Sequence, residues 1–137
     1  MISIEFTGTV KRAGHEPVSI PVQVILSYDV ANDPFAVQAA FGTDGDEGAV
    51  WTFSRSLLAV GATALFPYGQ GDVKFRYWPE ADIVVMCLTS PEGHADIALP
   101  CEPVNTFIAD TRPLIDQVDE REVEALVDGL LEEVFGK

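Results

Sequence analysis

The feature that most constrains the fold is a long alternation of apolar and polar residues between positions 18 and 30. Its apolar members are Val18, Ile20, Val22, Val24, Leu26, Tyr28 and Val30. Because successive side chains of a β-strand point to opposite faces, this period of two predicts a long strand with one buried face. Pro21 interrupts the run and has no amide hydrogen, so we expect an edge or a bulge there.

Shorter strand patterns fill most of the chain before residue 100. Ile83–Leu88 is apolar throughout, which is typical of a central strand covered on both faces. Ser54–Val60 can form about two helical turns that end near Gly61. The other expected strands are Ile2–Lys11, Phe35–Phe41, Val50–Phe53, Val73–Tyr77 and His94–Leu99.

The residues after position 100 have the pattern of helices. Glu102–Arg112 is expected to be one helix, which Pro113 ends because proline has no amide hydrogen. The closing segment repeats apolar residues at the spacing of an amphipathic helix. These residues are Val123, Leu126, Val127, Leu130, Leu131, Val134 and Phe135. We expect this stripe to cover the chain's own sheet or to pack against other subunits.

Length and composition indicate a single domain. The 137 residues are the size of one ordinary domain, and a hydrophobic fraction of 47% can fill its core. No linker or repeat divides residues 1–137, so we expect a strand-rich body over 1–100 and a helical end over 101–137. This pattern predicts the α+β class.

The charge of the chain disfavours two classes of partner. Its 22 acidic and 8 basic residues give a formal net charge of −14. Such a surface repels nucleic-acid phosphates and anionic lipid headgroups, so no nucleic acid is expected. No leader pattern and no membrane-spanning stretch is evident. We therefore expect a cytoplasmic protein that meets membranes only through partners.

No residue constellation predicts catalysis, a cofactor or a metal. His94 lies near Ser90, Glu92 and Asp96, but neighbours along a strand do not build a catalytic triad, and a surface histidine is the favoured interpretation. Cys87 and Cys101, with only two histidines, form no metal-binding pattern. We therefore expect a protein that is not an enzyme.

Two glycines and an arginine stand out near the middle of the chain. The run from Gly69 through Gly71 to Asp72 leads into a strand, which favours a hairpin over a phosphate-binding loop. Arg55 lies among apolar residues where a strand becomes a helix. We expect it to pair with an acidic group, Asp72 being the candidate. The alternative is that Arg55 faces outward in a partner site.

Aromatic residues suggest a contact surface. Trp51 is expected to belong to the scaffold. Phe75, Tyr77 and Trp78 suggest base stacking, but Lys74 and Arg76 are the only cations close to them and no basic groove is evident. We therefore favour core or subunit-interface aromatics and name Phe75, Tyr77 and Trp78 as candidate partner-binding residues.

An ordered series of motifs resembles the SsgA-like family of actinobacterial sporulation and cell-division proteins. The match runs from about Val18 to Arg112. Its parts are Tyr28, Asp33-Pro34-Phe35-Ala36-Val37, Trp51-x-Phe53-x-Arg55-x-Leu57-Leu58, Gly69-x-Gly71-Asp72-Val73, Trp78-Pro79, Ser90-Pro91-x-Gly93-x-Ala95 and Phe107-x-x-x-Thr111. The chain departs from the family at Ser54-Arg55-Ser56, where members typically carry Ala-Arg-Asp.

The resemblance implies a fold and a function. Family members are cytoplasmic and have no known catalytic activity. Their fold is similar to that of Whirly-type single-strand nucleic-acid-binding proteins: two packed antiparallel β-sheets with C-terminal helices, assembled as a homo-oligomer, with a trimer expected. Members act in sporulation-linked septation, including placement of the tubulin-like protein FtsZ and septal cell-wall remodelling.

The resemblance thus predicts a non-enzymatic adaptor located at division septa. Its expected partners are copies of itself and FtsZ or another septation protein. Two alternatives belong to other classes: a Whirly-like single-stranded nucleic-acid-binding protein, which the charge disfavours, and an enzyme acting on cell-wall material, which the missing nucleophile–base pair disfavours.

Overall fold

The computed structural model describes residues 1–12, 18–42, 48–69 and 71–118. The predicted amphipathic stripe from Val123 to Phe135 lies outside the described residues. The elements are β1 (Ile2–Arg12), β2 (Val18–Tyr28), β3 (Ala36–Gly42), β4 (Val50–Ser54), α1 (Arg55–Gly61), β5 (Val73–Trp78), β6 (Ile83–Ser90), β7 (Gly93–Pro100) and α2 (Cys101–Asp116).

The strands form one antiparallel sheet in the order β4-β3-β2-β1-β7-β6-β5. This corrects the prediction of two packed sheets. β1 is the reason, because it pairs along its whole length with β2 and also pairs with β7 at Thr9–Lys11. β1 therefore joins the half of the sheet made by β2, β3 and β4 to the half made by β5, β6 and β7, and the hydrogen-bonded ladder is continuous.

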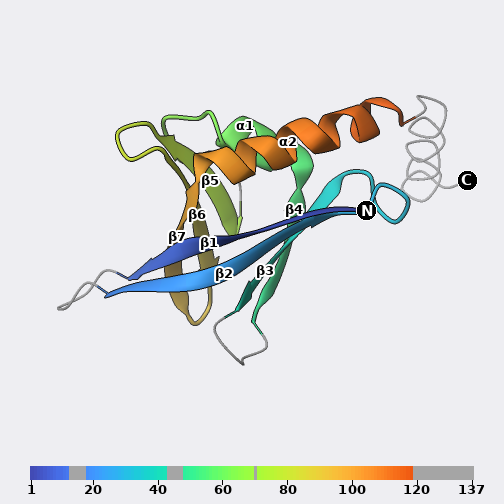
Figure 1. The fold of residues 1–137 in the computed structure, drawn as a ribbon. Coiled ribbons are helices and arrows are strands. Elements are labelled where there is room, and N and C mark those ends of the chain that lie inside the picture. The colour runs from blue at the N-terminus through green and yellow to red at the C-terminus, as the bar shows by residue number, and fades with distance from the viewer. Residues whose placement is uncertain (13–17, 43–47, 70, 119–137) are drawn as a thin grey trace, which may run out of the picture.

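The sheet is strongly curled, so its two ends meet across the core (Figure 1). Phe53 of β4 and Phe75 of β5 belong to opposite edge strands, yet their rings lie edge to face at 5.1 Å. The two halves thus face each other much as separate layers would. The fully buried side chains between them include Val24, Leu26, Tyr28, Val37, Leu58, Phe75, Val84, Met86, Leu99, Val104 and Phe107.

The long alternation forms β2 as predicted. From Val22 to Tyr28 every second side chain is buried. Pro21 lies opposite Thr9 of β1, whereas pairing with β3 begins only at Gln23, so the missing amide hydrogen of Pro21 interrupts no pairing with β3. Among the described residues β2 therefore has one neighbouring strand at the proline, which agrees with the predicted edge.

The predicted burial of the sixth strand on both faces is confirmed at its middle. Val84, Val85 and Met86 are consecutive and all buried. Consecutive side chains of a strand point to opposite faces, so both faces of the sheet are covered here.

The short helix α1 follows β4 without a loop. Ser54 caps it, because its hydroxyl accepts a hydrogen bond from the Leu57 amide at 3.0 Å. At the other end, a Cβ added to Gly61 would lie 2.4 Å from the Cβ of Phe75. Glycine at this position therefore lets α1 pack closely on β5.

Helix α2 continues through Pro113, contrary to the prediction that this proline ends it. A proline inside a helix costs about 3 kcal/mol. Two features offset that cost. Leu114, beyond the proline, packs against the core, and the turn before the proline is held by Arg55.

Arg55 joins the two helices through a buried fork, and α1 and α2 lie on the same side of the strands (Figure 1). Its Nε donates to the Thr111 hydroxyl at 2.8 Å, and its Nη2 donates to the Ile108 carbonyl at 2.7 Å. Arg55 is only 9% exposed and Thr111 is fully buried. The predicted pairing with Asp72 is therefore wrong, and so is the alternative of an outward-facing Arg55.

Replacing Arg55 should destabilise the fold. We expect Arg55→Met to lower the free energy of unfolding by about 2–4 kcal/mol, because two charge-assisted hydrogen bonds are lost from a buried site. Chemical denaturation measures the change. Arg112→Met, an exposed change on the same helix α2, should stay within about 0.5 kcal/mol.

A double-mutant cycle separates this contact from general helix destabilisation. Arg55→Met and Thr111→Val should show a coupling energy of about 1 kcal/mol or more. Additive effects would show that the fork does not link the helices.

Candidate functional site

The glycine motif forms the turn that leads into β5. Gly71 has a φ of +84° and Gly69 a φ of +138°, backbone conformations that favour glycine. A Cβ on Gly69 would also lie 2.7 Å from the Val73 carbonyl oxygen. The Asp72 carbonyl accepts a hydrogen bond from the Thr89 amide at 2.9 Å. These contacts, and the half-buried packing of Trp51 against the core, agree with the predicted scaffold role.

The three predicted partner-binding aromatics have different environments. Phe75 is fully buried, so its assignment to a partner surface is corrected: its ring packs on Phe53 instead. Tyr77 is half-buried and packs against the core. Trp78 is 44% exposed, and the Arg76 guanidinium lies 5.0 Å from its ring centroid. A partner-binding role for Tyr77 and Trp78 stays a prediction.

Sequence reasoning missed the most exposed apolar residues of this region. Leu65, Phe66 and Tyr68 are 59%, 81% and 45% exposed. Together with Trp78 we call them the aromatic surface. The available signal is the apolar pair Leu65-Phe66, which lies between α1 and β5 in a stretch without strand periodicity.

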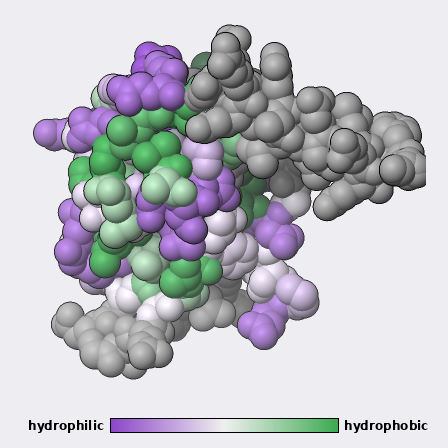
Figure 2. Space-filling model, turned by 90° about the vertical axis from the view of Figure 1, so that its right-hand side faces the viewer, coloured by the Kyte–Doolittle hydropathy of each residue, from purple (hydrophilic) through white to green (hydrophobic). Residues whose placement is uncertain are grey.

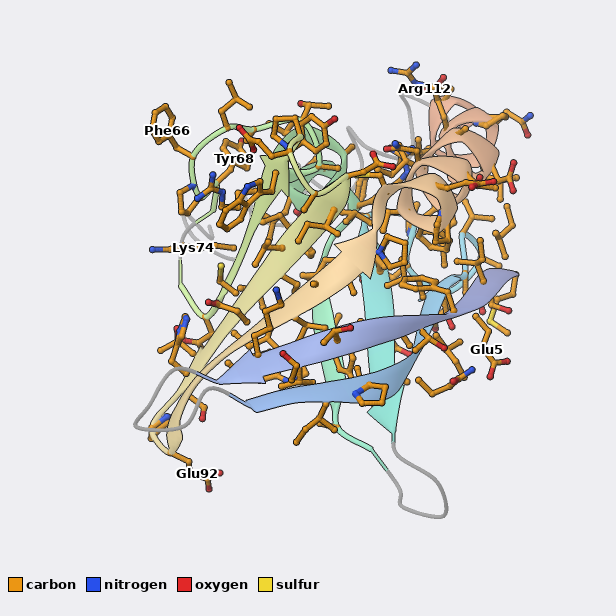
Figure 3. All side chains as sticks on the ribbon, turned by 60° about the vertical axis from the view of Figure 1, so that its left-hand side comes forward. Glu5, Phe66, Tyr68, Lys74, Glu92 and Arg112 are labelled. Atoms are coloured by element: carbon orange, nitrogen blue, oxygen red, sulfur yellow. The ribbon has the colours of Figure 1, made fainter. Side chains whose placement is uncertain are left out.

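Backbone hydrogen bonds hold the aromatic surface beside β5. The Tyr68 and Phe75 amides and carbonyls exchange hydrogen bonds at 2.8 and 3.0 Å, and the Tyr77 amide donates to the Ala64 carbonyl at 2.6 Å. The segment thus covers the outer edge of β5 and carries its side chains outward. In Figure 3, Phe66, Tyr68 and Lys74 project from the same side of the molecule.

Two surface hollows lie on the described part of the body, one of them beside the aromatic surface. One lies between the start of α1 and the aromatic surface, and its lining is Ser54, Ser56, Leu57, Pro67, Tyr68 and Gly69. The other is polar and is lined by Met1, Ser27, Asp29, Asn32, Asp33, Ala36, Gln38 and Thr52. Figure 2 shows the face that lies at the right-hand side of Figure 1, and hydrophobic residues lie beside hydrophilic ones on it.

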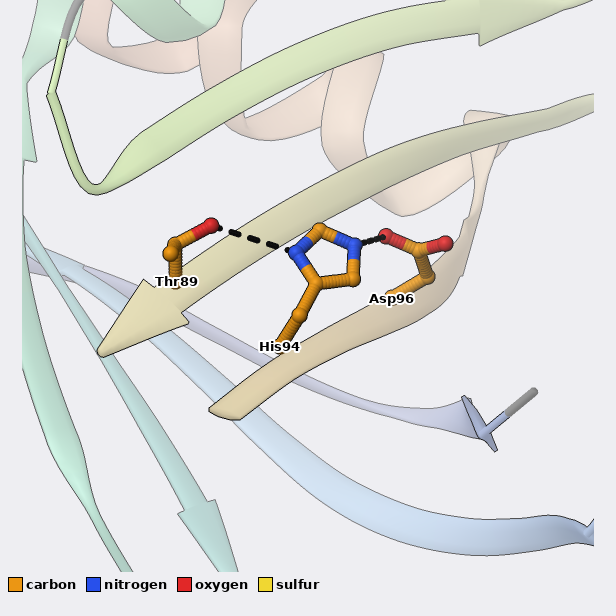
Figure 4. Close-up of polar contacts among 3 residues, drawn as sticks. All are labelled: Thr89, His94 and Asp96. Atoms are coloured by element: carbon orange, nitrogen blue, oxygen red, sulfur yellow. Dashed lines mark hydrogen bonds and ion pairs between the residues drawn. The ribbon is translucent and has the colours of Figure 1, made fainter. Parts of the chain in front are cut away.

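His94 lies between a hydroxyl and a carboxylate, as Figure 4 shows. Its Nδ1 is 3.1 Å from the Thr89 hydroxyl and its Nε2 is 2.8 Å from an Asp96 carboxylate oxygen. In the serine hydrolases Nε2 faces the nucleophile and Nδ1 faces the acid, so the order is reversed here. The His94 and Asp96 side chains are also 55% and 44% exposed.

This cluster therefore lacks the arrangement that activates a nucleophile. A catalytic acid–base pair works in a site that excludes water and orients its imidazole, whereas these groups lie on an open strand pair. The contacts join β6 to β7 across their turn, which agrees with the interpretation of His94 as a surface residue.

The cysteines are free thiols with low reactivity. Burial, followed by the negative charge of Asp96, raises the pKa of Cys87 to about 11. Burial, followed by Asp82, also raises the pKa of Cys101. Among the described residues no three His, Cys, Asp or Glu side chains gather as a metal site would require. Neither described helix is long and apolar enough to cross a bilayer.

The raised pKa of Cys87 predicts a loss of stability in alkali. The folded state holds the thiol protonated, so the contribution of Cys87 to stability is complete below the ordinary thiol pKa of 9.0 and is lost as the pH rises toward the raised pKa of about 11. We expect the free energy of unfolding to fall over that range, and to fall less in Cys87→Ala. Denaturation at several pH values tests this, and identical slopes for both proteins would contradict it.

Comparison with known proteins identifies relatives along most of the chain. The family model described as Streptomyces sporulation and cell division protein, SsgA, matches residues 22–120. The sporulation-specific cell division protein SsgB of Streptomyces coelicolor is 41% identical over 97 residues, which cover 68% of this chain and 67% of SsgB. SsgB of Salinispora tropica is 32% identical over 136 residues, covering 94% of this chain and 93% of the relative.

Solved structures have the same fold. One of them carries the description "Mutations in SsgB correlate to longitudinal cell division during sporulation of Streptomyces coelicolor". It matches this chain with a TM-score of 0.74 and 32% identity, over 88% of this chain and 93% of that one. An SsgA-like sporulation-specific cell division protein from Thermobifida fusca has a TM-score of 0.71 and 28% identity, over 96% of both chains. The chain therefore belongs to the SsgA family of sporulation and cell division proteins.

Proposed function

We propose that this protein is a non-enzymatic adaptor of sporulation-specific cell division. It holds FtsZ or another septation protein at the site of the future septum, and cell-wall remodelling follows from that placement. Membership of the SsgA family supports the role in sporulation and division. The observation that carries the adaptor role is the exposed aromatic surface, because soluble proteins rarely leave such residues together unless they contact a partner.

A homo-oligomer, with a trimer as the proposed form, would present several copies of this surface. Each copy contacts a partner weakly, and linked copies raise the overall affinity by the effective concentration of the second site. The protein itself stays in the cytoplasm, on the inner side of the septum. Its membrane position depends on its partners.

A Whirly-like nucleic-acid-binding role is less well supported. A net charge of −14 opposes phosphate contacts, and Phe75, one of the aromatics that suggested base stacking, is buried in the core.

Light scattering tests the oligomer. Size exclusion with light scattering at micromolar concentration should give a mass that is a multiple of 14.8 kDa, with a trimer expected. A monomer across the whole concentration range would contradict the display mechanism but would leave the fold unaffected.

Capture of FtsZ tests the aromatic surface. Purified wild-type protein should retain FtsZ on an affinity resin, and Phe66→Ala should reduce the retained amount several-fold, because an exposed aromatic anchor is lost. Phe35→Ala is the matched control, since Phe35 is 45% exposed in another loop. Equal retention by all three proteins would remove the aromatic surface from the proposal.

A further inference from the structure

The outer face of β5 carries two cations in a strongly acidic protein. Lys74, Arg76 and Trp78 alternate with buried Val73 and Phe75 along this strand. Successive strand residues point to opposite faces, so these three side chains form a row away from the core. We call Lys74, Arg76 and Trp78 the cationic strip.

Within the part of the chain that the structure describes, no carboxylate forms an ion pair with the cationic strip. Among the described residues, the one side-chain ion pair within 4.0 Å is that of His94 with Asp96, so neither Lys74 nor Arg76 has a carboxylate that close. Asp96 is the acid next along the sheet, because Cys87 lies opposite both Lys74 and Asp96, and it is engaged by His94.

Arg76 is held in place without a full set of hydrogen bonds. Its Nε is enclosed and has no acceptor among the described residues. Its guanidinium lies 5.0 Å from the Trp78 ring centroid, a cation–π contact that fixes the orientation of both side chains. Because Nε is enclosed, an incoming carboxylate would pair with the outer nitrogens of the guanidinium, which the cation–π contact holds in place.

The cationic strip adjoins the aromatic surface. The two share Trp78, and Tyr68 pairs through its backbone with Phe75, directly between Lys74 and Arg76 along β5. Figure 3 shows Phe66 and Tyr68 on the same side of the molecule as Lys74, while Arg112 projects from α2 and Glu5 lies at the opposite side. Positive charge and exposed apolar area therefore occur together here.

We propose that the cationic strip and the aromatic surface together bind an acidic protein segment that carries apolar anchor residues. Carboxylates of the segment pair with Lys74 and Arg76, and its apolar side chains cover Phe66, Tyr68 and Trp78. Charge complementarity selects the occupant, since the chain as a whole carries a net charge of −14 and the two cations of the strip are where an acidic segment is attracted. A nucleic acid fits less well, because two cations on a short strand provide no continuous groove for a backbone.

This inference deepens the proposed function and rests on it only for the expectation that the occupant is a protein. The probe is a fluorescein-labelled peptide in which glutamate alternates with leucine and phenylalanine. Fluorescence anisotropy should show binding that weakens with added salt. The same peptide with lysine in place of glutamate should not bind.

Two charge reversals locate the contact. Lys74→Glu should weaken peptide binding by about five- to tenfold, because attraction becomes repulsion at the strip. Arg112→Glu makes the same change of net charge on α2 and should alter binding by less than about twofold. Both residues are exposed, so both variants should fold. Trp78→Ala should also weaken binding.

Several results would overturn the inference. The first is that the acidic peptide does not bind, and the second is that Lys74→Glu and Arg112→Glu weaken its binding equally. The third is that the protein binds single-stranded oligothymidylate and loses this binding in Lys74→Glu. The fourth is that Lys74→Glu changes the mass of the oligomer. If FtsZ capture depends on Phe66 while the peptide does not bind, the strip is wrong and the adaptor role stands. If the peptide binds at the strip and FtsZ is not captured, the adaptor role fails and the strip stands.

Discussion

The buried fork of Arg55 connects parts of the fold that the sheet does not connect. Arg55 and Thr111 are 56 positions apart, and their hydrogen bond ties the β4–α1 junction to α2. The same guanidinium reaches the Ile108 carbonyl, one turn before Pro113. A buried guanidinium is costly to desolvate, so it is tolerated only where its donors are satisfied. The fork therefore adds a direct link between the two helices to the core packing of Leu58, Val104 and Phe107.

The curled sheet determines which residues can meet a partner. Its edge strands β4 and β5 meet through Phe53 and Phe75. Phe75, one of the three aromatic residues predicted to bind a partner, therefore lies in the core. The outer edge of β5 is covered by the segment around Tyr68, which leaves Phe66 and its neighbours on the surface. The fold thus leaves this apolar segment at the surface, which is where the proposed adaptor role requires a contact.

Local pattern predicted most of the elements, because side-chain periodicity reports burial directly. The alternation of β2, the strand–helix junction at Ser54 and the turn at Gly71 were all evident. The errors share a cause. The partner of Arg55, the continuation of α2 past Pro113 and the burial of Phe75 all depend on contacts with distant residues. The exposed Leu65–Tyr68 segment was missed because a surface segment needs no periodicity.

Periodicity, composition and motif order are local properties of the chain, so they were enough to predict the α+β class, the acidic charge and the family. The continuity of the sheet could not be predicted in this way, because it depends on the pairing of β1 with both β2 and β7. The same holds for the pairing of Arg55 within the fold and for the position of Lys74 and Arg76 on its outer face. Which side of a strand faces water is decided by what packs against the other side, and that neighbour is distant in sequence.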